Sequence, residues 1–547
     1  MIYFSTLMMA LFVTLSLIPP LKAMAVRCHA VDLPNERKVH CTPIPKIGGI
    51  AMAIGAVMPV LLWAVEGVFA KSIIAGASVI VIFGFLDDIF DLPYLTKFAA
   101  QIVSALIVVL FGGLQIHSLG NLAPENFLLP QWGAVPLTVF VIVGVTNAIN
   151  LSDGLDGLAG GITLMTFVCI GYLAFRSGDF FGLTLSAGVI GAIFGFLRFN
   201  THPAIIFMGD TGSQFLGFLA ICLSIALTQS SVLYSPLLPL ILLGFPILDT
   251  LTVMAERIAR GRPPFEADKN HFHHKLMRLG LYHSEAVIVI YFIQTFLVAS
   301  AFIFRYQTER FLIFYYGLFS GCILAFFHNA VKDGWVVRRY PLIDHVIKGK
   351  FRVLREKHLL IKVSHNIVRF GLPSLFVFSA VMPATIPRYF AIFALVMAIG
   401  LLAVIVMKGS AALRALRIAT YLVIPYLVFL SQTDHVGWMT LRAVLVYDLS
   451  YGILVFFVII TLKFTRRKKG FKATPMDYLI LLIALVVPNL SGLELRDFSM
   501  GLLAVKIIVM LFSYEVLAGE MRQNLDTLAY PTIGGLLVIF ARGVLSF

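Results

Sequence analysis

AVPLTVFVIVGVTNAINLSDGLDGLAGGITLMTFVCIGYLAF, residues 134–175, holds two apolar runs that flank a short polar stretch. Each run is long enough to cross a membrane as a helix. The polar stretch between them, INLSDGLDGLAGG (149–161), contains Asp153 and Asp156, each followed by a glycine. Charged side chains at the depth or edge of a membrane are costly and usually mark function or a paired structural role. The pattern therefore predicts a helical membrane protein with a polar site where two spans meet.

The composition of the whole chain supports the same class of protein. Of its 547 residues, 59% are hydrophobic and 13% are charged, whereas a soluble domain is about 25% charged. The net charge of +14 is typical of a membrane protein whose Lys and Arg residues lie in cytoplasmic loops. Because these residues lie in short loops, they do not indicate nucleic-acid binding. The five cysteines form no CxxC pair, so neither a disulfide framework nor a zinc site is indicated.

Apolar runs of about 17–25 residues predict an all-α polytopic fold. About eleven transmembrane helices precede residue 332, and about seven more follow the basic segment after it. The first run ends in Ala-Met-Ala, which imitates a cleavage site. It lacks the positive charge that begins a signal peptide, so we interpret it as a span. The eleven N-terminal runs are centred near residues 13, 57, 78, 105, 142, 167, 189, 220, 244, 295 and 320.

The loops between these runs alternate in charge. The loops at 22–46 and 256–285 are rich in Lys and Arg, whereas the loop at 113–132 has neither. By the positive-inside rule, the two basic loops are cytoplasmic and the third is outside. This assignment brings four polar clusters to the cytoplasmic side, and we expect them to form one site. They are FLDDIFD (85–91), NLSDGLDG (150–157), RFNTHPAIIFMGDTGS (198–213) and ADKNHFHHK (267–275).

The first cluster places Asp87, Asp88 and Asp91 within one helical turn. Residues three and four apart on a helix are neighbours, so these carboxylates would repel one another and raise one another's pKa. Such a group is usually held by a divalent cation or by nearby Lys and Arg. The alternative is a solvated helix end that only terminates the span.

The second cluster repeats a polar residue every third position. On an ideal helix, Asn147, Asn150 and Asp153 share a face, and Asp156 begins to leave it. The glycines after the two aspartates would allow the backbone to unwind and approach a ligand closely. We predict a polar pocket where the span frays; the alternative is a structural helix cap.

The remaining clusters supply a metal ligand and a basic segment. Asp210, between glycines, suits a Mg²⁺–phosphate site. His271, His273 and His274, followed by Lys275, could be phosphate contacts, zinc ligands or a surface loop. The carboxylate-rich surroundings favour Mg²⁺ or Mn²⁺ over zinc, and hence phosphate contacts. Carboxylates that bind a metal, together with basic residues that bind an anion, are typical of phosphoryl transfer. The membrane setting suggests that one substrate is a lipid phosphate.

Five ordered motifs then resemble one bacterial family, the polyprenyl-phosphate N-acetylhexosamine-1-phosphate transferases of glycosyltransferase family 4. The motifs are DLPNERKVHCTPIPKIGG, DDIFDLPYLTK, NAINLSDGLDGLAGG, RFNTHPAIIFMGDTGS and HFHHKLMRLG. The form of the last motif is more similar to the branch that initiates O-antigen, teichoic acid or enterobacterial common antigen than to the peptidoglycan translocase. The resemblance covers residues 1–331. It implies transfer of a sugar-1-phosphate from a UDP-N-acetylhexosamine to undecaprenyl phosphate, with release of UMP.

The resemblance also implies roles for residues. Asp87 and Asp88 match the catalytic aspartates, Asp210 the Mg²⁺ ligand, and Asp153 and Asp156 belong to the nucleotide-and-metal pocket. Leu155, Asp156, Asn200 and Phe207 match the uridine pocket, and the histidines match a motif near the phosphates. We therefore predict catalytic Asp87 and Asp88, metal ligands Asp210 and Asp153, and substrate contacts from Asn147, Asn150, Leu155, Asp156, Asn200, Phe207, His271, His273, His274 and Lys275.

The predicted setting is a multi-pass protein of the bacterial cytoplasmic membrane with its site facing the cytoplasm. Its expected partners are a UDP-sugar, undecaprenyl phosphate, membrane lipid and Mg²⁺ or Mn²⁺, with a homodimer as an option. Two mechanisms stay open, direct attack by the lipid phosphate and a covalent phospho-enzyme. The lipid phosphate is already mostly dianionic at neutral pH, which favours direct attack.

Residues after 331 are not covered by the resemblance. Residues 332–370 carry ten Lys or Arg and are predicted to form a basic amphipathic linker on the inner leaflet. Residues 371–547 are predicted to form a C-terminal transmembrane bundle, to which the sequence assigns no role. The rival class is a transporter of an anionic solute, which predicts internal repeats and charges at mid-span. A CDP-alcohol phosphotransferase is a weaker rival, because the Ala-Arg and later aspartates of that family are absent.

Overall fold

The computed structural model describes residues 2–27, 30–32, 43–124, 127–230, 234–263, 270–333, 335, 359–407, 412–433, 440–464, 494–495, 498–520 and 526–545. In this part of the chain twelve helices are long and apolar enough to cross a membrane, so the predicted all-α polytopic class is confirmed. The chain divides into two compact units. The N-terminal unit is residues 1–337 with 474–479, and the C-terminal unit is 338–473 with 480–547.

Each of the eleven runs expected in the N-terminal unit is helical. The helices are α1 Ile2–Arg27, α2 Gly48–Trp63, α3 Gly67–Phe90, α4 Tyr94–Leu106 with a π-helical turn Ile107–Phe111, α5 Gln131–Leu151, α6 Leu158–Ser177, α7 Phe180–Asn200, α8 Gly209–Ser230, α9 Leu238–Leu242 with α10 Gly244–Ala259, α12 His283–Ile303 and α13 Glu309–Lys332. A short helix, α11 Phe272–Arg278, precedes α12.

The run centred near residue 244 is one span in the sequence but two helices in the structure. Helix α9 ends at Leu242 and α10 begins at Gly244. Pro246 has no backbone N–H, so the carbonyl of Leu242 cannot receive the helical hydrogen bond that would continue the span.

Helix α8 lies at the centre of the N-terminal unit and is buried over most of its length. It packs against α3, α5, α6 and α2, while α1 covers α2 and α7. Two glycines allow close approach at its N-terminus. A Cβ on Gly84 would lie 2.6 Å from the Cα of Thr211, and one on Gly49 would lie 2.3 Å from the amide nitrogen of Gly212. Small residues are the usual means by which membrane helices approach this closely.

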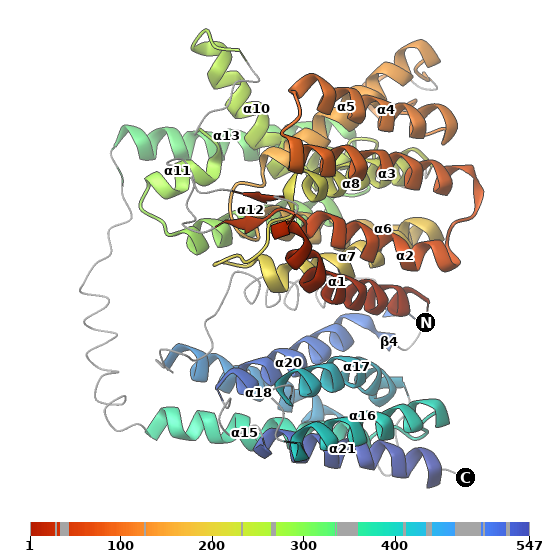
Figure 1. Cartoon of the computed structure of the whole chain (residues 1–547). Helices are drawn as coiled ribbons and strands as arrows, with labels where there is room; N and C mark the ends of the chain where they lie inside the picture. The colour runs from red at the N-terminus through yellow and green to blue at the C-terminus, as the bar shows by residue number, and fades with distance from the viewer. Residues whose placement is uncertain are drawn as a thin grey trace. The chain divides into compact units, whose positions relative to one another are not determined.

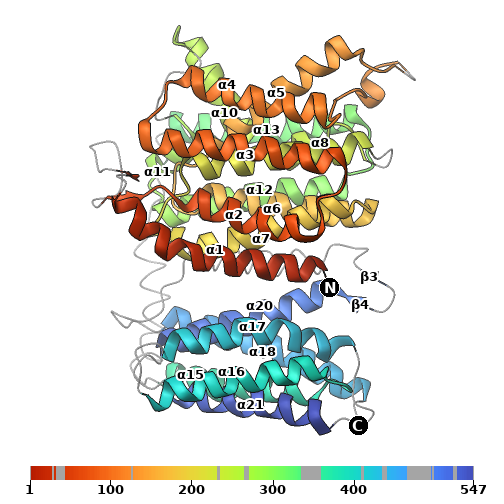
Figure 2. The ribbon, with the colours of Figure 1, turned by 45° about the vertical axis from the view of Figure 1, so that its right-hand side comes forward.

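The hairpin of β1 Val31–Asp32 and β2 Ile44–Pro45 fixes the connection that leads into α8. The amide of Phe207 donates to the carbonyl of Pro45 at 2.8 Å, and the amide of Gly48 donates to the carbonyl of Phe207 at 2.9 Å. Figures 1 and 2 show this red hairpin and α11 at the same end of the bundle formed by α3, α6, α7 and α8. That end is where α3 and α5 finish and α8 begins.

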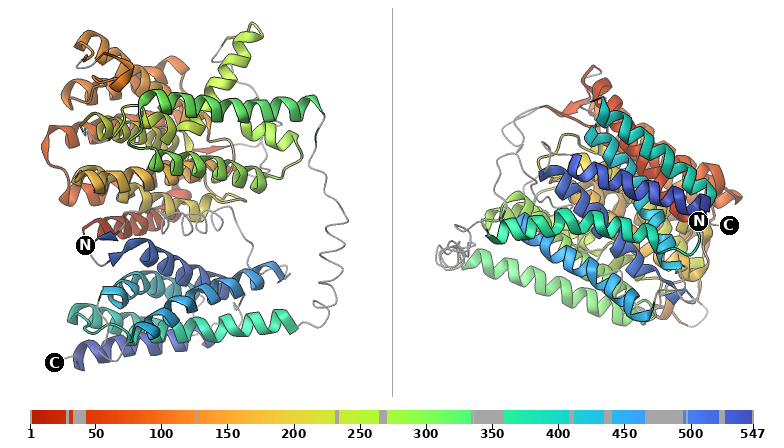
Figure 3. Two further views of the ribbon diagram at one scale, coloured as in Figure 1. Left: turned by 180° about the vertical axis from the view of Figure 1, so that it is seen from behind. Right: turned by 90° about the horizontal axis from the view of Figure 1, so that it is seen from below.

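The C-terminal unit contains six helices among its described residues. They are α15 Leu359–Val381, α16 Arg388–Val406, α17 Ala412–Thr433, α18 Leu441–Phe464, α20 Met500–Glu520 and α21 Asp526–Leu545, with a hairpin of β3 Glu494–Leu495 and β4 Phe498–Ser499. Helix α15 packs against α18 and α21, and α16 packs against α17 and α21 (Figure 3). About seven spans were expected here, and residues 465–493 lie outside the described part.

The predicted linker at 332–370 falls largely outside the described residues, because 336–358 are not described. Helix α15 already begins at Leu359. Residues 359–370 are therefore helical and continuous with the first helix of the C-terminal unit, rather than separate from it.

Candidate active site

The paired aspartates lie in the last turn of α3 and are buried. Asp87 is 5% exposed and Asp88 is 9% exposed. The third carboxylate of the motif does not join them. Asp91 ends the helix in the left-handed conformation, with φ of 53°, and it is exposed. The expectation of three carboxylates sharing one turn is therefore wrong for Asp91, because the helix has ended before it.

Asp88 binds the beginning of α8. Its Oδ1 accepts from the amide of Asp210 at 2.9 Å, and its Oδ2 accepts from the amide and hydroxyl of Thr211 at 3.1 and 2.7 Å. A carboxylate at this position satisfies amides that have no partner within the helix. Gly209 has φ of 68°, and a Cβ there would lie 2.3 Å from Oδ2 of Asp88. Asp88 therefore fixes the position of Asp210.

Lys97, in the first turn of α4, joins the two motifs. Its Nζ lies 2.6 Å from Oδ2 of Asp87 and 3.1 Å from Oδ2 of Asp210. The amide of Leu92 donates to the other oxygen of Asp87 at 2.8 Å. Sequence reasoning did not select Lys97, although it lies in the quoted DDIFDLPYLTK motif. The sequence did predict that a divalent cation or a nearby Lys or Arg holds the aspartates, and Lys97 is such a residue.

Asn147 and Asn150 fasten α5 to its neighbours. The side-chain amide of Gln101 donates to Asn147 at 3.3 Å and to Gln214 at 3.0 Å, and Asn147 donates back to Gln101 at 2.5 Å. The hydroxyl of Ser213 donates to Asn150 at 2.6 Å. These two predicted substrate contacts are thus held by α4 and α8. Their partners Gln101, Gln214 and Ser213 carried no motif signal beyond polarity within an apolar helix.

Helix α5 ends at Leu151 and α6 begins at Leu158, so the predicted fraying of the span is confirmed. Asp153 lies beyond the helix end, and it therefore does not share a helical face with Asn147 and Asn150 as expected. Burial, together with the negative charges of Asp210, Asp156 and Asp88, raises the pKa of Asp153 to about 8.

Asp156, in the loop between α5 and α6, is held from three directions. Nδ1 of His202 lies 2.7 Å from its Oδ2, and the amide of Ala204 donates to the same oxygen at 3.1 Å. Its own amide donates to Nε2 of His283 at 3.0 Å. The two imidazoles stack, with centroids 4.2 Å apart and planes 22° apart. Neither histidine was predicted, and a single histidine in a sequence gives no signal for such a contact.

Asp156, His202 and His283 are close enough together to be considered as a metal site. The geometry favours a hydrogen-bonded clamp. The lone pairs of two stacked rings lie in nearly parallel planes and do not readily converge on one ion, and Nε2 of His283 already accepts from the amide of Asp156. We refer to these contacts as the Asp156 clamp.

The predicted uridine-pocket residues surround the same loop. Asn200 accepts from the amide of Gly157 at 2.9 Å and donates to the carbonyl of Ile206 at 2.9 Å. It thereby ties the loop after α5 to the connection before α8. Leu155 is buried and Phe207 is partly buried. The structure brings these residues together, and their contact with a nucleotide stays a prediction.

The histidine motif forms α11 and reaches this loop. Asp249 holds its start, with Oδ2 3.0 Å from Nδ1 of His271 and Oδ1 accepting from the amide of Phe272 at 2.8 Å. His273 lies against Gly154, where a Cβ would be 2.4 Å from the imidazole ring. Burial, with lesser effects from the neighbouring histidines, lowers the pKa of His273 to about 3. His273 is therefore uncharged at neutral pH.

The positive charge of this motif comes instead from its basic residues. Nζ of Lys275 lies 2.6 Å from Oε1 of Glu256 on α10. The ring of His274 lies beside that of His273, with centroids 4.2 Å apart. The zinc alternative gains no support, because the motif's histidines form no metal-binding group within the described residues.

The site as a whole carries five aspartates, two from α3, one from α8 and two from the loop after α5, and Lys97 pairs with two of them. The ligand set is oxygen-rich, and burial together with the neighbouring aspartates raises the pKa of Asp153. Mg²⁺ and Mn²⁺ prefer carboxylate oxygens, so the residues present fit such an ion.

The chain is thus a polytopic helical membrane protein with a carboxylate-rich site at one end of its N-terminal bundle. The pattern of glycosyl transferase family 4 matches residues 70–228. The chain is 41% identical over 314 residues to a probable undecaprenyl-phosphate N-acetylglucosaminyl 1-phosphate transferase of Bacillus subtilis, covering 56% of this chain and 86% of that protein. This chain belongs to glycosyl transferase family 4.

Two further relatives agree. The undecaprenyl-phosphate alpha-N-acetylglucosaminyl 1-phosphate transferase of Escherichia coli K12 is 30% identical over 341 residues, covering 60% of this chain and 91% of that protein. The decaprenyl-phosphate N-acetylglucosaminephosphotransferase of Mycobacterium tuberculosis is 34% identical over 304 residues, covering 50% of this chain and 75% of that protein. The family predicted from the ordered motifs is confirmed.

Proposed function

We propose that this protein transfers N-acetylglucosamine-1-phosphate from UDP-N-acetylglucosamine to undecaprenyl phosphate and releases UMP. This reaction would begin the synthesis of a lipid-linked polysaccharide of the cell envelope. The names of the relatives support the donor sugar and the lipid acceptor. The observation that carries the proposal is the bridge from Lys97 to Asp87 and Asp210, which unites two distant motifs in one charged site.

The reaction is a phosphoryl transfer. An oxygen of the lipid phosphate forms a bond to the β-phosphorus of the UDP-sugar. The bond from that phosphorus to the bridging oxygen breaks, and the bridging oxygen leaves with UMP. The lipid phosphate is already mostly dianionic at neutral pH, so direct attack needs no strong base.

The chain's own residues hold and orient the charged groups. Asp210 and Asp153 would hold Mg²⁺ or Mn²⁺, and the bound ion would neutralise charge on the pyrophosphate and the leaving group. Lys97 holds Asp87 beside Asp210. Asp88 accepts from three donors at the start of α8, so it acts as a positioning residue. Asp87 is then the better candidate of the catalytic pair.

The proposed location is the cytoplasmic membrane of a bacterium, with the site at the cytoplasmic face. The described parts of the basic loops at 22–46 and 256–285 adjoin the same end of the bundle as the site. The transporter alternative is less well supported, because the site aspartates lie at helix ends and in a loop rather than at mid-span.

A labelled donor tests the reaction. Purified protein is incubated with undecaprenyl phosphate, Mg²⁺ and UDP-N-acetylglucosamine labelled at the β-phosphorus, alongside a panel of other UDP-sugars. We expect the label to enter the lipid fraction. Label that stays in UDP would contradict sugar-1-phosphate transfer, and label entering only with another UDP-sugar would correct the donor.

A further inference from the structure

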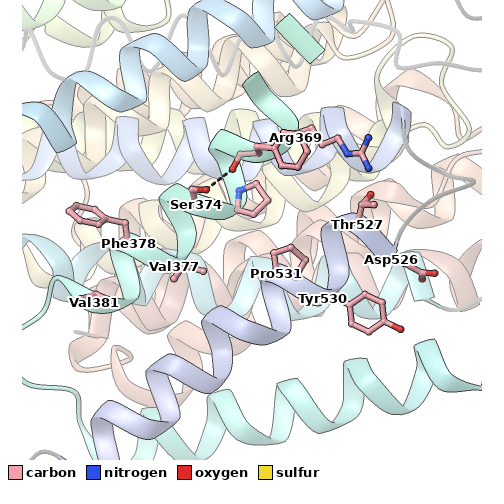
Figure 4. A pocket seen from close by; sticks show the side chains of 11 residues that line it. Arg369, Ser374, Val377, Phe378, Val381, Asp526, Thr527, Tyr530 and Pro531 are labelled. Carbon is pink, nitrogen blue, oxygen red and sulfur yellow. Dashed lines mark hydrogen bonds between the residues drawn. The ribbon is translucent and has the colours of Figure 1, made fainter. Parts of the chain in front are cut away.

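A groove runs between α15 and α21 of the C-terminal unit. It has a volume of about 710 Å³, and all its lining residues belong to these two helices. Figure 4 shows that its two ends differ. The guanidinium of Arg369 and the side chains of Asp526, Thr527 and Tyr530 lie toward one end, whereas Val377, Phe378 and Val381 lie toward the other. The groove is therefore amphipathic along its length.

The polar end carries a cation whose guanidinium is incompletely satisfied. Nε of Arg369 is buried and has no hydrogen-bond partner among the described residues; its described contact is with the ring of Phe370, 5.5 Å away. Two other cations of this unit have partners: Lys506 lies 2.5 Å from Asp448, and Arg542 donates to two carbonyls. A buried donor without a partner is costly, so a ligand that accepts from Arg369 would be stabilised.

The same end also carries acceptors. Asp526, in the first turn of α21, is exposed and forms no ion pair with a described residue. Pro373 has no N–H, so the carbonyl of Arg369 cannot receive its helical hydrogen bond. A cation, a carboxylate and a released carbonyl thus lie together at one end of an apolar groove. This arrangement complements a headgroup that carries both a phosphate and an ammonium group.

The apolar length matches a lipid chain in one leaflet. From Arg369 to Val381, α15 rises about 18 Å at 1.5 Å per residue, and one leaflet contributes about 15 Å of hydrocarbon. Arg369 ends a segment, 332–370, that carries ten Lys or Arg, which the positive-inside rule assigns to the inner side. The polar end of the groove then lies at the level of the inner-leaflet headgroups.

We propose that this groove binds an aminophospholipid of the inner leaflet. Arg369 binds the phosphate, Asp526 and the carbonyl of Arg369 accept from the ammonium, and an acyl chain lies along Phe370, Val377 and Phe378. Asp526 disfavours an acidic lipid, because such a headgroup has no cation to pair with it. A polyprenyl phosphate is disfavoured for the same reason. The inference is independent of the reaction proposed for the N-terminal unit.

Lipid retention tests the proposal. The full-length protein is purified in a mild detergent and offered equal amounts of phosphatidylethanolamine, phosphatidylcholine, phosphatidylglycerol and undecaprenyl phosphate, and bound lipid is counted by native mass spectrometry. We expect phosphatidylethanolamine to be preferred, because phosphatidylcholine lacks N–H donors and phosphatidylglycerol lacks a cation. Arg369→Gln should lower its retention about tenfold, and Asp526→Asn should remove the preference over phosphatidylglycerol.

Two further variants complete the test. Val377→Trp fills the apolar part of the groove and leaves Arg369 intact, so it should also lower retention; it decides the outcome if thermal unfolding shows that Arg369→Gln is misfolded. Arg442→Gln, at the start of α18, is the matched control and should retain lipid as the wild type does. Equal retention by wild type, Arg369→Gln and Val377→Trp would overturn the proposal, as would a preference for undecaprenyl phosphate or phosphatidylglycerol.

Discussion

Asp153 differs from the other aspartates of the site in its described contacts. Lys97 pairs with Asp87 and Asp210, and Asp88 accepts from the beginning of α8. No described side chain donates to Asp153, and its pKa is raised to about 8 by burial and by the charges of the other aspartates. A divalent cation would relieve this repulsion, so metal binding and stability should be linked through this residue.

The first prediction follows from that linkage. Unfolded Asp153 loses its proton near pH 3.8, whereas the folded protein keeps it to about pH 8. Between these values the unfolded state binds fewer protons, so stability falls as the pH rises. In EDTA, the melting temperature of the wild type should fall between pH 5 and 8 more steeply than that of Asp153→Asn. Mg²⁺ should restore it most at pH 8. Identical slopes for the two proteins would contradict the assignment.

The Asp156 clamp leads to a second prediction at the residue scale. If Asp156 contacts the nucleotide, the bond from His202 sets its orientation without touching the reacting phosphates. His202→Ala should raise the KM for the UDP-sugar about tenfold, about 1.4 kcal/mol, with little change in kcat. The KM for the lipid acceptor should stay the same.

His117→Ala, in the loop between α4 and α5 that is assigned to the opposite side, is the matched control. A fall in kcat alone for His202→Ala, or an equal effect of His117→Ala, would show that the clamp does not act through donor binding.

At the scale of the element, the ends of helices proved harder to predict than the helices. Apolar length predicted each span of the N-terminal unit, because a membrane helix needs a long apolar run. The end of α3 before Asp91 and the break before α10 depend on local backbone geometry. Which residues contact the predicted site residues depends on tertiary structure. These partners are Lys97, Asp249, His202 and His283. A sequence pattern can indicate such a contact only when both residues lie in one motif, as Lys97 and Asp87 do.

The junction of α11 with the loop after α5 gives a third prediction. A Cβ on Gly154 would lie 2.4 Å from the ring of His273, so Gly154→Ala must displace α11 or the loop. We expect a loss of stability of about 1–3 kcal/mol and a large loss of activity. Gly144→Ala, on α5 with open space around its Cβ, is the control. Thermal unfolding and activity of the two variants check the prediction, and similar behaviour of both would contradict the contact.

At the scale of the whole molecule, charge alternation in the loops predicted that distant motifs meet at one end. The structure brings together the ends of α3, α5 and α7 with the starts of α6 and α8, as that argument requires. The second unit could be predicted as a transmembrane bundle, but the groove within it could not. A groove depends on how helices pack and where prolines such as Pro373 interrupt them, which apolar length does not specify.

The fourth prediction concerns the division of labour between the units. All site residues lie before residue 332, and the compact N-terminal unit includes residues up to 337. A chain shortened to residues 1–337 should therefore still release UMP from the UDP-sugar. Thermal unfolding and size-exclusion chromatography must accompany the assay, because loss of the second unit could expose apolar surface. A shortened protein that is folded and monodisperse yet inactive would show that the C-terminal unit completes the active site.

The central claim is metal-dependent transfer of a sugar-1-phosphate at the site of Asp87, Asp153 and Asp210. Release of UMP by the purified full-length protein tests it most directly, with undecaprenyl phosphate, UDP-N-acetylglucosamine and Mg²⁺ present. We predict one UMP for each lipid-linked product and none in EDTA. Asp210→Asn, inserted normally in the membrane, should give below about a tenth of the wild-type rate, a loss of at least about 1.4 kcal/mol. Full activity in EDTA, or UDP in place of UMP, would contradict the claim.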